Sequence, residues 1–483
     1  MFFKNELMRT LRKIGPLIFS AINSFISLIT TFYIAGALGT EIYGTLQYYL
    51  SIITVFSTII SFGLNYHLVK NANKTNNTKE LFTNSFLLFD IVTLISFAPF
   101  LFFCFFFLEK LNHSIAIIII LFVASALFGL VHIVEAFLLG MKKINTSIFF
   151  MSLLPKIMVL IISLLLIFLL NNYNNFPVYY LYFFTCIYFL IVLPFLFIYL
   201  KKVRLHFEKK DFVSILFFFL ISVTAILNNN VSKILQGEIS DSMSNVGVLA
   251  LCMQIVVLSQ IFSGVITSIS RPFFSAYSTD KEKLIAYFQK VLRINSYFVI
   301  PFLIAFSIEA KQLLSFFWIE YSAYPLILTI LAISALVSNL TGPNGTMLSM
   351  AGHEKLEVLN SIIHIVVYFV FGLFLTKITI YGLPLAILFS TVIINVMKVI
   401  EIRIVYKINP YNFKIILHLC SMCLIASISF YLISLVNNPV LWILLNCVVG
   451  LLLIICYIFF SPYKDDKYFF IVKRKGTYEK TKY

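Results

Sequence analysis

The chain has 483 residues, of which 61% are hydrophobic and 12% charged, and its mean hydropathy is +0.99. So apolar a chain is typical of a polytopic membrane protein and leaves no stretch for a soluble ATP-binding domain. The net charge of +16 does not indicate nucleic acid as a partner, because the basic residues are scattered through short loops. Orientation in a membrane and contact with anionic lipid headgroups explain them more simply.

Charged or Asn/Pro-rich breaks divide the chain into fourteen apolar segments. An apolar run of about 20 residues spans the hydrocarbon core as a helix. The apolar residues are continuous rather than alternating, which excludes a barrel. The fold class predicted is an all-α membrane protein with about 14 transmembrane helices. The segments cover 15–36, 46–66, 81–107, 114–139, 148–170, 178–200, 212–235, 245–270, 294–312, 325–348, 357–376, 380–402, 415–436 and 440–460.

The basic residues alternate from gap to gap along the chain. The N-terminus, every second gap with its flanking turns, and the C-terminal tail together hold 31 of the 36 Lys and Arg residues. Cytoplasmic loops of membrane proteins carry this excess of positive charge. The pattern predicts that both termini are cytoplasmic, and that the basic loops at 67–80 and 201–211 lie on the same side.

Short matches between the two parts of the chain indicate an internal repeat. Gly44 and Gly247 each begin an apolar segment and are 203 residues apart, and Pro177 and Pro384 are 207 apart. Two six-helix repeats enter the membrane in the same direction, so they are related by an axis along the membrane normal. We therefore predict two parallel six-helix lobes plus a C-terminal helix pair. The ranges are 1–200 for the N-lobe, 201–211 for a cytoplasmic linker, 212–407 for the C-lobe, 408–460 for the pair, and 461–483 for a cytoplasmic tail.

Residues 38–44, LGTEIYG, resemble the LGxxxYG signature of Wzx-type O-antigen flippases, of the multidrug/oligosaccharidyl-lipid/polysaccharide exporter superfamily. Ser232 to Leu235 followed by Val246-Gly247, Arg271-Pro272, and Phe317 to Tyr321 also resemble that family, and the similarity covers roughly residues 10 to 460. The chain departs from the family at Ser232, where an Asp is common, and at Leu249, where a Tyr is expected.

The resemblance implies a transporter and not an enzyme. The substrate implied is an undecaprenyl-diphosphate-linked oligosaccharide, an O-antigen or similar repeat unit for lipopolysaccharide, moved from the cytoplasmic to the periplasmic leaflet of a bacterial inner membrane. Membrane lipids are implied partners, with a polysaccharide polymerase and a chain-length regulator as further candidates. No cofactor is implied, and no GxxxxGK[ST] motif occurs. Seven cysteines, including the pair Cys420 and Cys423, fit helix packing better than a metal or redox site.

Charged side chains within the segments are the candidate substrate-binding residues, because a charge in the bilayer needs a partner or a wet cavity. Lys156 follows the kinking Pro155, and Asp90 lies at similar depth in segment three. One reading is an ion pair that only locks two helices. The other places Lys156 in a central cavity, where it contacts an anionic headgroup and Asp90 positions it.

The other candidates have two readings each. Lys233 either snorkels to the outer interface or shares a hydrated face with Asn230 and the two asparagines before it. Arg271 either reflects positive-inside placement or receives the diphosphate at the inner mouth. Glu135 either snorkels to the interface or caps its helix, or it takes part in ion coupling. Histidines such as His132 either bond a neighbour or relay protons.

Two rival functions remain open. A multidrug or small-molecule antiporter of the same superfamily would typically have twelve helices, so the extra pair favours the polysaccharide branch. An O-antigen polymerase would need catalytic groups on a sizeable outer loop. The longest outer loop here has about ten to fifteen residues and no paired acids with a base.

Overall fold

The structure is a computed structural model that describes residues 2–463, apart from 73–76, 109–110, 112–113, 171, 201–208, 241, 318 and 437. Side chains are described from residue 22 onward, with gaps mainly in the helix that follows residue 208. Most of the predicted linker at 201–211 and of the predicted tail at 461–483 thus lies outside the described residues.

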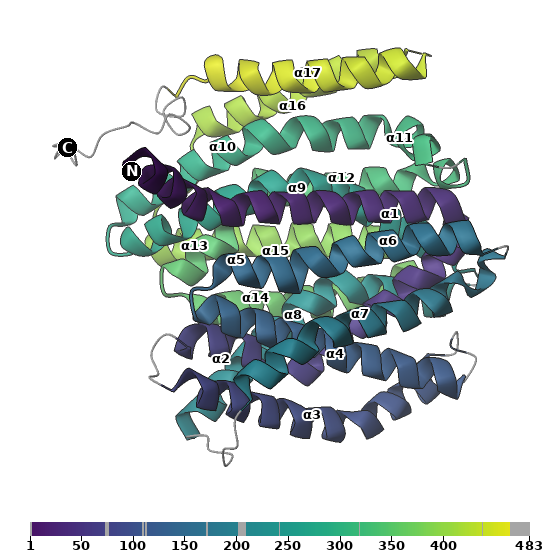
Figure 1. The fold of residues 1–483 in the computed structure, drawn as a ribbon. Coiled ribbons are helices and arrows are strands. Elements are labelled where there is room, and N and C mark those ends of the chain that lie inside the picture. Colours follow the sequence, from purple (N-terminus) through teal and green to yellow (C-terminus); the bar gives the residue numbers. More distant parts are fainter. Residues whose placement is uncertain are drawn as a thin grey trace. The chain divides into compact units, whose positions relative to one another are not determined.

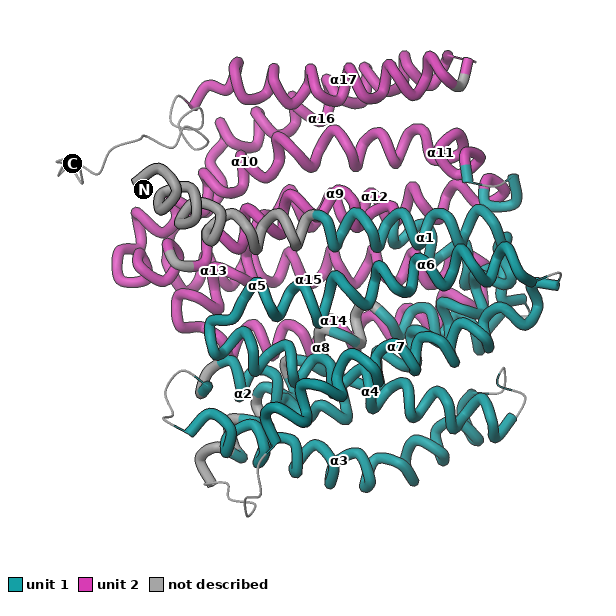
Figure 2. Tube along the Cα trace, in the orientation of Figure 1, with its two compact units in different colours: residues 1–254, 317–321 teal, residues 255–316, 322–483 magenta. Residues whose placement is uncertain are grey.

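The described chain is helical and packs as two compact units (Figures 1 and 2). Unit 1 comprises residues 1–254 and 317–321, and unit 2 comprises 255–316 and 322–483. This division by packing does not test the predicted lobes at 1–200 and 212–407, which stay a prediction. Unit 1 contains α1 (Phe2–Ser61), α2 (Leu64–Asn71), α3 (Thr78–Phe107), α4 (Ile115–Gly140), α5 (Ile144–Ser147), η2 (Ile148–Leu153), α6 (Leu154–Leu169), η3 (Tyr173–Asn175), α7 (Phe176–Tyr199), α8 (Lys209–Ile239) and the start of α9 (Ser244–Ala276).

Unit 2 takes up the rest of α9 and the helices that follow it. These are α10 (Lys281–Ile308), α11 (Ala310–Phe317), η4 (Tyr321–Ala323), α12 (Pro325–Leu340), α13 (Asn344–Met350), α14 (Glu354–Leu375), α15 (Gly382–Tyr406), α16 (Phe413–Ser434) and α17 (Pro439–Phe459), with the junction residues 317–321 assigned to unit 1. Side-chain caps begin several of them: the carboxylate of Asp280 accepts the Lys283 N–H at the start of α10, and the Asn438 amide oxygen accepts two N–H groups of α17.

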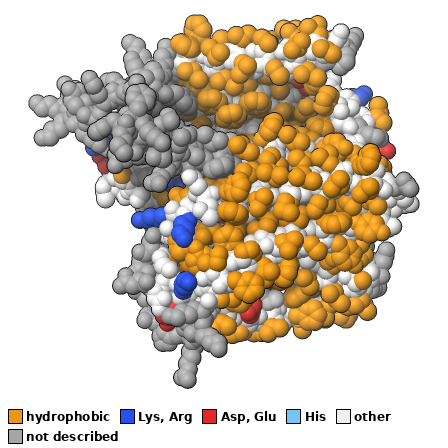
Figure 3. Space-filling view, viewed as in Figure 1, with side chains coloured by type: hydrophobic (Ala, Val, Ile, Leu, Met, Phe, Trp, Pro, Cys, Tyr) orange, Lys and Arg blue, Asp and Glu red, His pale blue; other side chains and the backbone are white. Residues whose placement is uncertain are grey.

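The predicted apolar segments fall on helices, which confirms the all-α membrane fold. Eleven helices in the described residues are long and apolar enough to cross a membrane, or twelve if α12 and α13, bent by 41°, form one span. The predicted 15–36 lies within α1, 46–66 runs from α1 into α2, and 212–235 lies within α8. The predicted fourteen is therefore an approximate number. Figure 3 shows hydrophobic side chains over most of the face where α3, α4, α6 and α7 lie, as a lipid environment requires.

The LGxxxYG residues each have a structural role in unit 1. Gly39 has φ 77° and ψ 179°, a conformation essentially restricted to glycine, and it breaks α1 into two helical arms. Tyr43 is buried. Tyr321 donates to the carbonyl of Ala35 at 3.3 Å, so the short segment 317–321 packs on the same arm of α1.

Gly44 and Gly247, matched in the sequence as repeat-related positions, meet in unit 1. A Cβ on Gly44 would lie 1.9 Å from the carbonyl oxygen of Met243, and a Cβ on Gly247 would lie 2.1 Å from that of Thr40. Each glycine thus faces the carbonyl four residues before the other, in a reciprocal backbone contact of the kind that small residues permit between helices.

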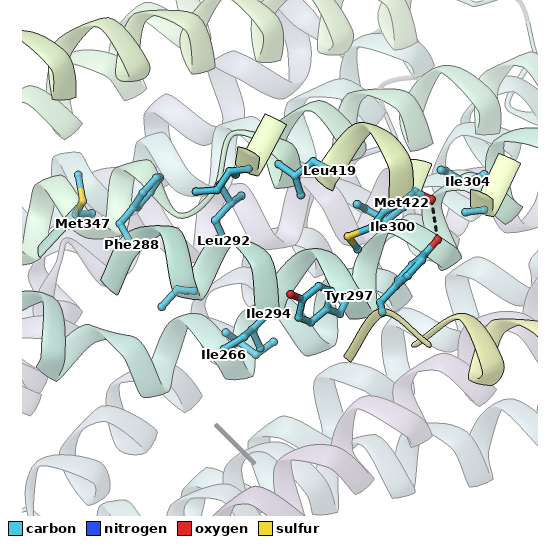
Figure 4. Close-up of a cluster of buried hydrophobic side chains, with 14 of the residues drawn as sticks. Ile266, Phe288, Leu292, Ile294, Tyr297, Ile300, Ile304, Met347, Leu419 and Met422 are labelled. Atoms are coloured by element: carbon cyan, nitrogen blue, oxygen red, sulfur yellow. Dashed lines mark hydrogen bonds between the residues drawn. The ribbon is translucent and has the colours of Figure 1, made fainter. Parts of the chain in front are cut away.

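Unit 2 is built around α10, which packs on α12, α16 and α17. Figure 4 shows Tyr297, Ile300 and Ile304 of α10 in one buried cluster with Leu419 and Met422 of α16. The carbonyl of Met422 accepts a hydrogen bond from Tyr457 of α17 at 2.7 Å. The α10 helix begins at Lys281, earlier than the predicted 294, because its charged first turns interrupt the apolar run without ending the helix.

A largely buried ion pair joins α14 to α15. The Nζ of Lys398 lies 2.7 Å from Oε1 of Glu357, with side chains 15% and 25% exposed, and Asn360 donates to Glu401 nearby at 2.6 Å.

We expect Lys398→Met alone to lower the stability of the chain in detergent by ~2–4 kcal/mol, because Glu357 is left buried without its cation. Thermal unfolding would measure it. The double variant with Glu357→Gln should recover most of the loss, and Glu354→Gln, at an exposed position of α14, is the matched control. A double variant as unstable as Lys398→Met would contradict this account.

Candidate functional site

Unit 1 contains a cavity that includes one of the predicted cations. Both arms of α1, together with α4, α6 and α7, line a volume of about 220 Å³. Lys156 is the charged side chain among the residues that line it, and it is half-buried. The break at Gly39 explains why one continuous segment can supply residues from Ser27 to Thr54 to the same cavity.

The wall from α1 is polar and the wall from α4 and α7 is aromatic. Thr30 and Thr54 donate their hydroxyl protons to carbonyls of their own helix, at 2.8 and 2.7 Å, which leaves their oxygen lone pairs as acceptors. Opposite them, Phe128, Phe184 and Tyr188 form a packed set with ring centroids 4.5 to 5.9 Å apart. Hydroxyl acceptors, aromatic faces and one ammonium group therefore surround a single space.

A second predicted cation, Lys233, is hydrogen-bonded to a glutamine that lines this cavity. Lys233 of α8 donates from Nζ to Oε1 of Gln47 at 3.3 Å, and Gln47 lines the cavity. Next to it, the Tyr48 hydroxyl donates to Glu238 of α8. The structure thus places Lys233 against α1 within unit 1, with its ammonium group held by a neutral amide, which leaves its charge available to an anion.

The local backbone around Lys156 is irregular. Pro155 cannot donate to the helix ladder, and its ring would crowd the carbonyl of Met151, four residues earlier. That carbonyl belongs to η2, a π-helical stretch over Ile148–Leu153, where the wider turn accommodates the proline. The insertion sets the direction from which Lys156 enters the cavity.

The carboxylate whose charge acts on Lys156 is Glu135 of α4. Its Oε1 accepts from the Ser152 hydroxyl at 2.8 Å, and its Oε2 lies 3.3 Å from Nδ1 of His132. Glu135 and His132 also line a separate cavity of about 470 Å³ with Asn65, Tyr66 and Phe218. Glu135 is therefore held by neighbours from two helices rather than capping its own.

The remaining predicted residues lie elsewhere. Asp90 is half-buried on α3 and is not among the residues lining the Lys156 cavity. Because α3 packs mainly on α4, α1 and α2, the expected Asp90–Lys156 pair is not formed. Asn230 donates to the Ile226 carbonyl of its own helix at 3.4 Å. Arg271 is exposed on the part of α9 that belongs to unit 2.

Sequence reasoning missed Gln47, the aromatic wall, and the influence of the Glu135 charge on Lys156. One signal was available, because Tyr180, Phe184 and Tyr188 recur every four residues and so share one face of α7. Gln47 gave no signal, since a single glutamine in an apolar segment has many possible roles. No cluster of three or more His, Cys, Asp or Glu side chains suited to a metal ion occurs in the part of the chain that the structure describes.

The size of the cavity limits what it can hold. At about 220 Å³ it is smaller than the roughly 300–1,000 Å³ of typical drug-sized ligand sites. It has room for a phosphate group or one sugar ring rather than a whole oligosaccharide. Its chemistry suits such a fragment, because ammonium groups bind phosphate oxygens, and hydroxyl-rich and aromatic walls suit a ring with polar edges.

Comparisons with known proteins identify a sequence family and solved structures with a similar fold. A sequence profile described as "Polysaccharide biosynthesis protein" matches residues 11–278. A solved structure of the lipid II flippase MurJ in an inward closed conformation is similar with a TM-score of 0.65 at 15% identity, covering 92% of this chain and 98% of that one. An inward-facing multidrug resistance MATE family transporter of the MOP superfamily is similar with a TM-score of 0.64 at 13% identity, covering 80% and 94%. No curated protein matches the chain.

Proposed function

Because the chain belongs to the polysaccharide biosynthesis protein family, we propose that it is a flippase for an undecaprenyl-diphosphate-linked oligosaccharide, such as an O-antigen repeat unit. It moves this lipid from the cytoplasmic to the periplasmic leaflet of a bacterial inner membrane, with both termini cytoplasmic. The MurJ-like fold supports a lipid-linked substrate, since that structure is of a lipid II flippase. A polysaccharide polymerase and a chain-length regulator are the partners that would use the product.

The observation that carries the proposal is the Lys156 cavity. A diphosphate linked to sugars cannot cross hydrocarbon unaided, because its charges would lose their hydration. Lys156 supplies a cation at the cavity wall, and Lys233 supplies a second one through Gln47. In this assignment Lys156 and Lys233 neutralise the negative charge of the diphosphate. The α1 hydroxyls and the aromatic wall contact the first sugar, and the lipid tail remains in the bilayer.

The other predicted residues have secondary roles in this proposal. Glu135 sets the position of Lys156 through its charge. Arg271, exposed on α9, is a candidate for the first contact with the diphosphate, and Asp90 and Asn230 remain candidates for coupling. Transport proceeds by alternating exposure of the substrate site to the two sides of the membrane.

A small-molecule antiporter is the second candidate, because MATE transporters share the fold. Their structures cover about 80% of this chain, against 92% for the MurJ structure. That difference favours the flippase, since α16 and α17 form a further helix pair beyond the predicted twelve helices of the two lobes. A polymerase is disfavoured by the short outer connections.

Transport by the purified full chain in liposomes tests the proposal. We expect a diphosphate-linked lipid oligosaccharide to move between leaflets, as measured by its accessibility to an enzyme added outside, and to gain no new glycosidic bonds. A monophosphate analogue should compete less well, because phosphate charge carries the contact with Lys156. Chain extension would instead identify a polymerase, and drug efflux without lipid movement would identify an antiporter.

A further inference from the structure

Unit 2 contains a buried carboxyl group at the C-terminal end of α10, which the predicted topology places on the outer side. Glu309 is the C-cap residue, one position beyond the last residue of the candidate span Lys281–Ile308, and only 3% of it is exposed. Its backbone is satisfied, since its N–H donates to Ala305 at 2.8 Å and its carbonyl accepts from Leu313 at 2.9 Å. Its side-chain Oε1 has no hydrogen-bond partner among the described residues.

The surroundings of this carboxyl come mainly from the C-terminal helix pair. Trp442 and Asn446 of α17 lie against it, and Trp442 is 8% exposed. Gln312 binds the Ser434 carbonyl at the end of α16 at 3.3 Å, which ties the neighbouring turn to the same pair. The carboxyl therefore sits in the contact between α10 and α17.

No described cation compensates Glu309. The described part of α17 and the whole of α12 carry no Lys, Arg, His, Asp or Glu. Lys414 and His418 of α16 are near the opposite end of that helix, and its outer-end Tyr431 is exposed, as is Cys447 of α17. Lys311 on α11 is exposed as well, so it lies in the solvent-facing layer rather than against the buried carboxyl.

Burial without a cation penalises the ionised form of a carboxyl. It raises the pKa of Glu309 from its ordinary value of 4.5 to about 7, and the Asn446 and Trp442 side chains offset only part of that effect. The protonated, neutral form is the one that fits between α10 and α17. As the pH rises from about 4.5 toward 7, the state with this carboxyl buried becomes progressively less stable relative to a state in which the carboxyl is exposed and ionised.

We propose that Glu309 is a proton-binding site on the outer side of the membrane, and that its ionisation loosens the packing of α17 against α10. The proton comes from the aqueous phase at the outer end of α10. When the carboxyl loses it, the charge draws water toward Trp442 and the outer turn of α17 separates. The C-terminal helix pair thereby responds to the acidity outside, whatever molecule the protein transports.

Trp442 reports on this site, because the chain has only two tryptophans. In a Trp318→Phe background, the fluorescence of the purified full chain in nanodiscs would be titrated between about pH 5 and pH 9. We expect the emission to shift to longer wavelength as the pH rises, with a midpoint near 7, and acrylamide to quench Trp442 more strongly above that midpoint.

Two variants make the test specific. Glu309→Gln should keep the emission at its short-wavelength position at every pH, whereas Lys311→Gln, the matched exposed neighbour, should titrate as the parent does. If Glu309→Gln fails to fold, Glu309→Asp takes its place in the test. This variant should move the midpoint of the Trp442 fluorescence titration. An unchanged titration in Glu309→Gln or Glu309→Asp would overturn the proton site, as would a parent that does not titrate. A wavelength shift without a change in quenching would overturn the loosening of α17.

Discussion

Replacing Lys156 with alanine should reduce transport by about 10- to 100-fold at equal protein level. Lys156 is the charged group that lines the cavity of unit 1, and a hydrogen bond to a charged group contributes roughly 1.5–3 kcal/mol. Lys156→Arg should retain more activity than Lys156→Gln, because it keeps the positive charge although the guanidinium has a different shape. The measurement is export of surface polymer in cells, with movement of the lipid-linked substrate in liposomes as the direct assay.

The control for this prediction is Glu135, whose charge acts on Lys156. If Lys156 only compensates Glu135, the double variant Lys156→Ala with Glu135→Gln would regain transport, because neither charge would then be left unpaired. If Lys156 binds the anionic substrate, the double variant stays inactive. Normal export by Lys156→Ala would remove the cavity from the mechanism altogether.

A methyl group on Gly44 should be among the most damaging small changes in the chain. Gly44→Ala would place its Cβ 1.9 Å from the Met243 carbonyl oxygen, and backbone atoms cannot move aside as a flexible side chain can. The second arm of α1 and the start of α9 would have to separate, at a cost of about 1–3 kcal/mol or more. We expect loss of stability in detergent and loss of most transport, measured as the apparent melting temperature and polymer export.

Gly450 is the matched control for Gly44. It also lies within a helix, α17, but a Cβ there would meet no atom within 4 Å. Gly450→Ala should be neutral or slightly stabilising, because alanine favours the helix by about 1 kcal/mol over glycine. Gly247→Ala should reproduce the effect of Gly44→Ala, since its Cβ would approach the Thr40 carbonyl in the same way. Equal behaviour of the Gly44 and Gly450 variants would contradict the close approach.

The sequence by itself determined the membrane architecture. A helix that crosses lipid must satisfy its own backbone and present apolar side chains nearly all round, so each span shows as a continuous run that needs no tertiary information. The run at 81–107, for example, appears as α3 (Thr78–Phe107). Within LGTEIYG, Gly39 combines φ 77° with ψ 179°, a conformation that only glycine adopts readily.

Only the tertiary structure decided which charges and aromatics come together. Depth along two helices made Asp90 a reasonable partner for Lys156, but depth does not say which helices are neighbours or which way a side chain points. Because α4 packs beside the π-helical insertion before Lys156, the carboxylate whose charge acts on Lys156 is Glu135 instead. In the same way, Gln47 and Lys233 meet across 186 residues of sequence, and Glu309 is buried against a helix that begins 130 residues later. Contacts between residues so far apart depend on how helices pack, which apolar periodicity does not encode.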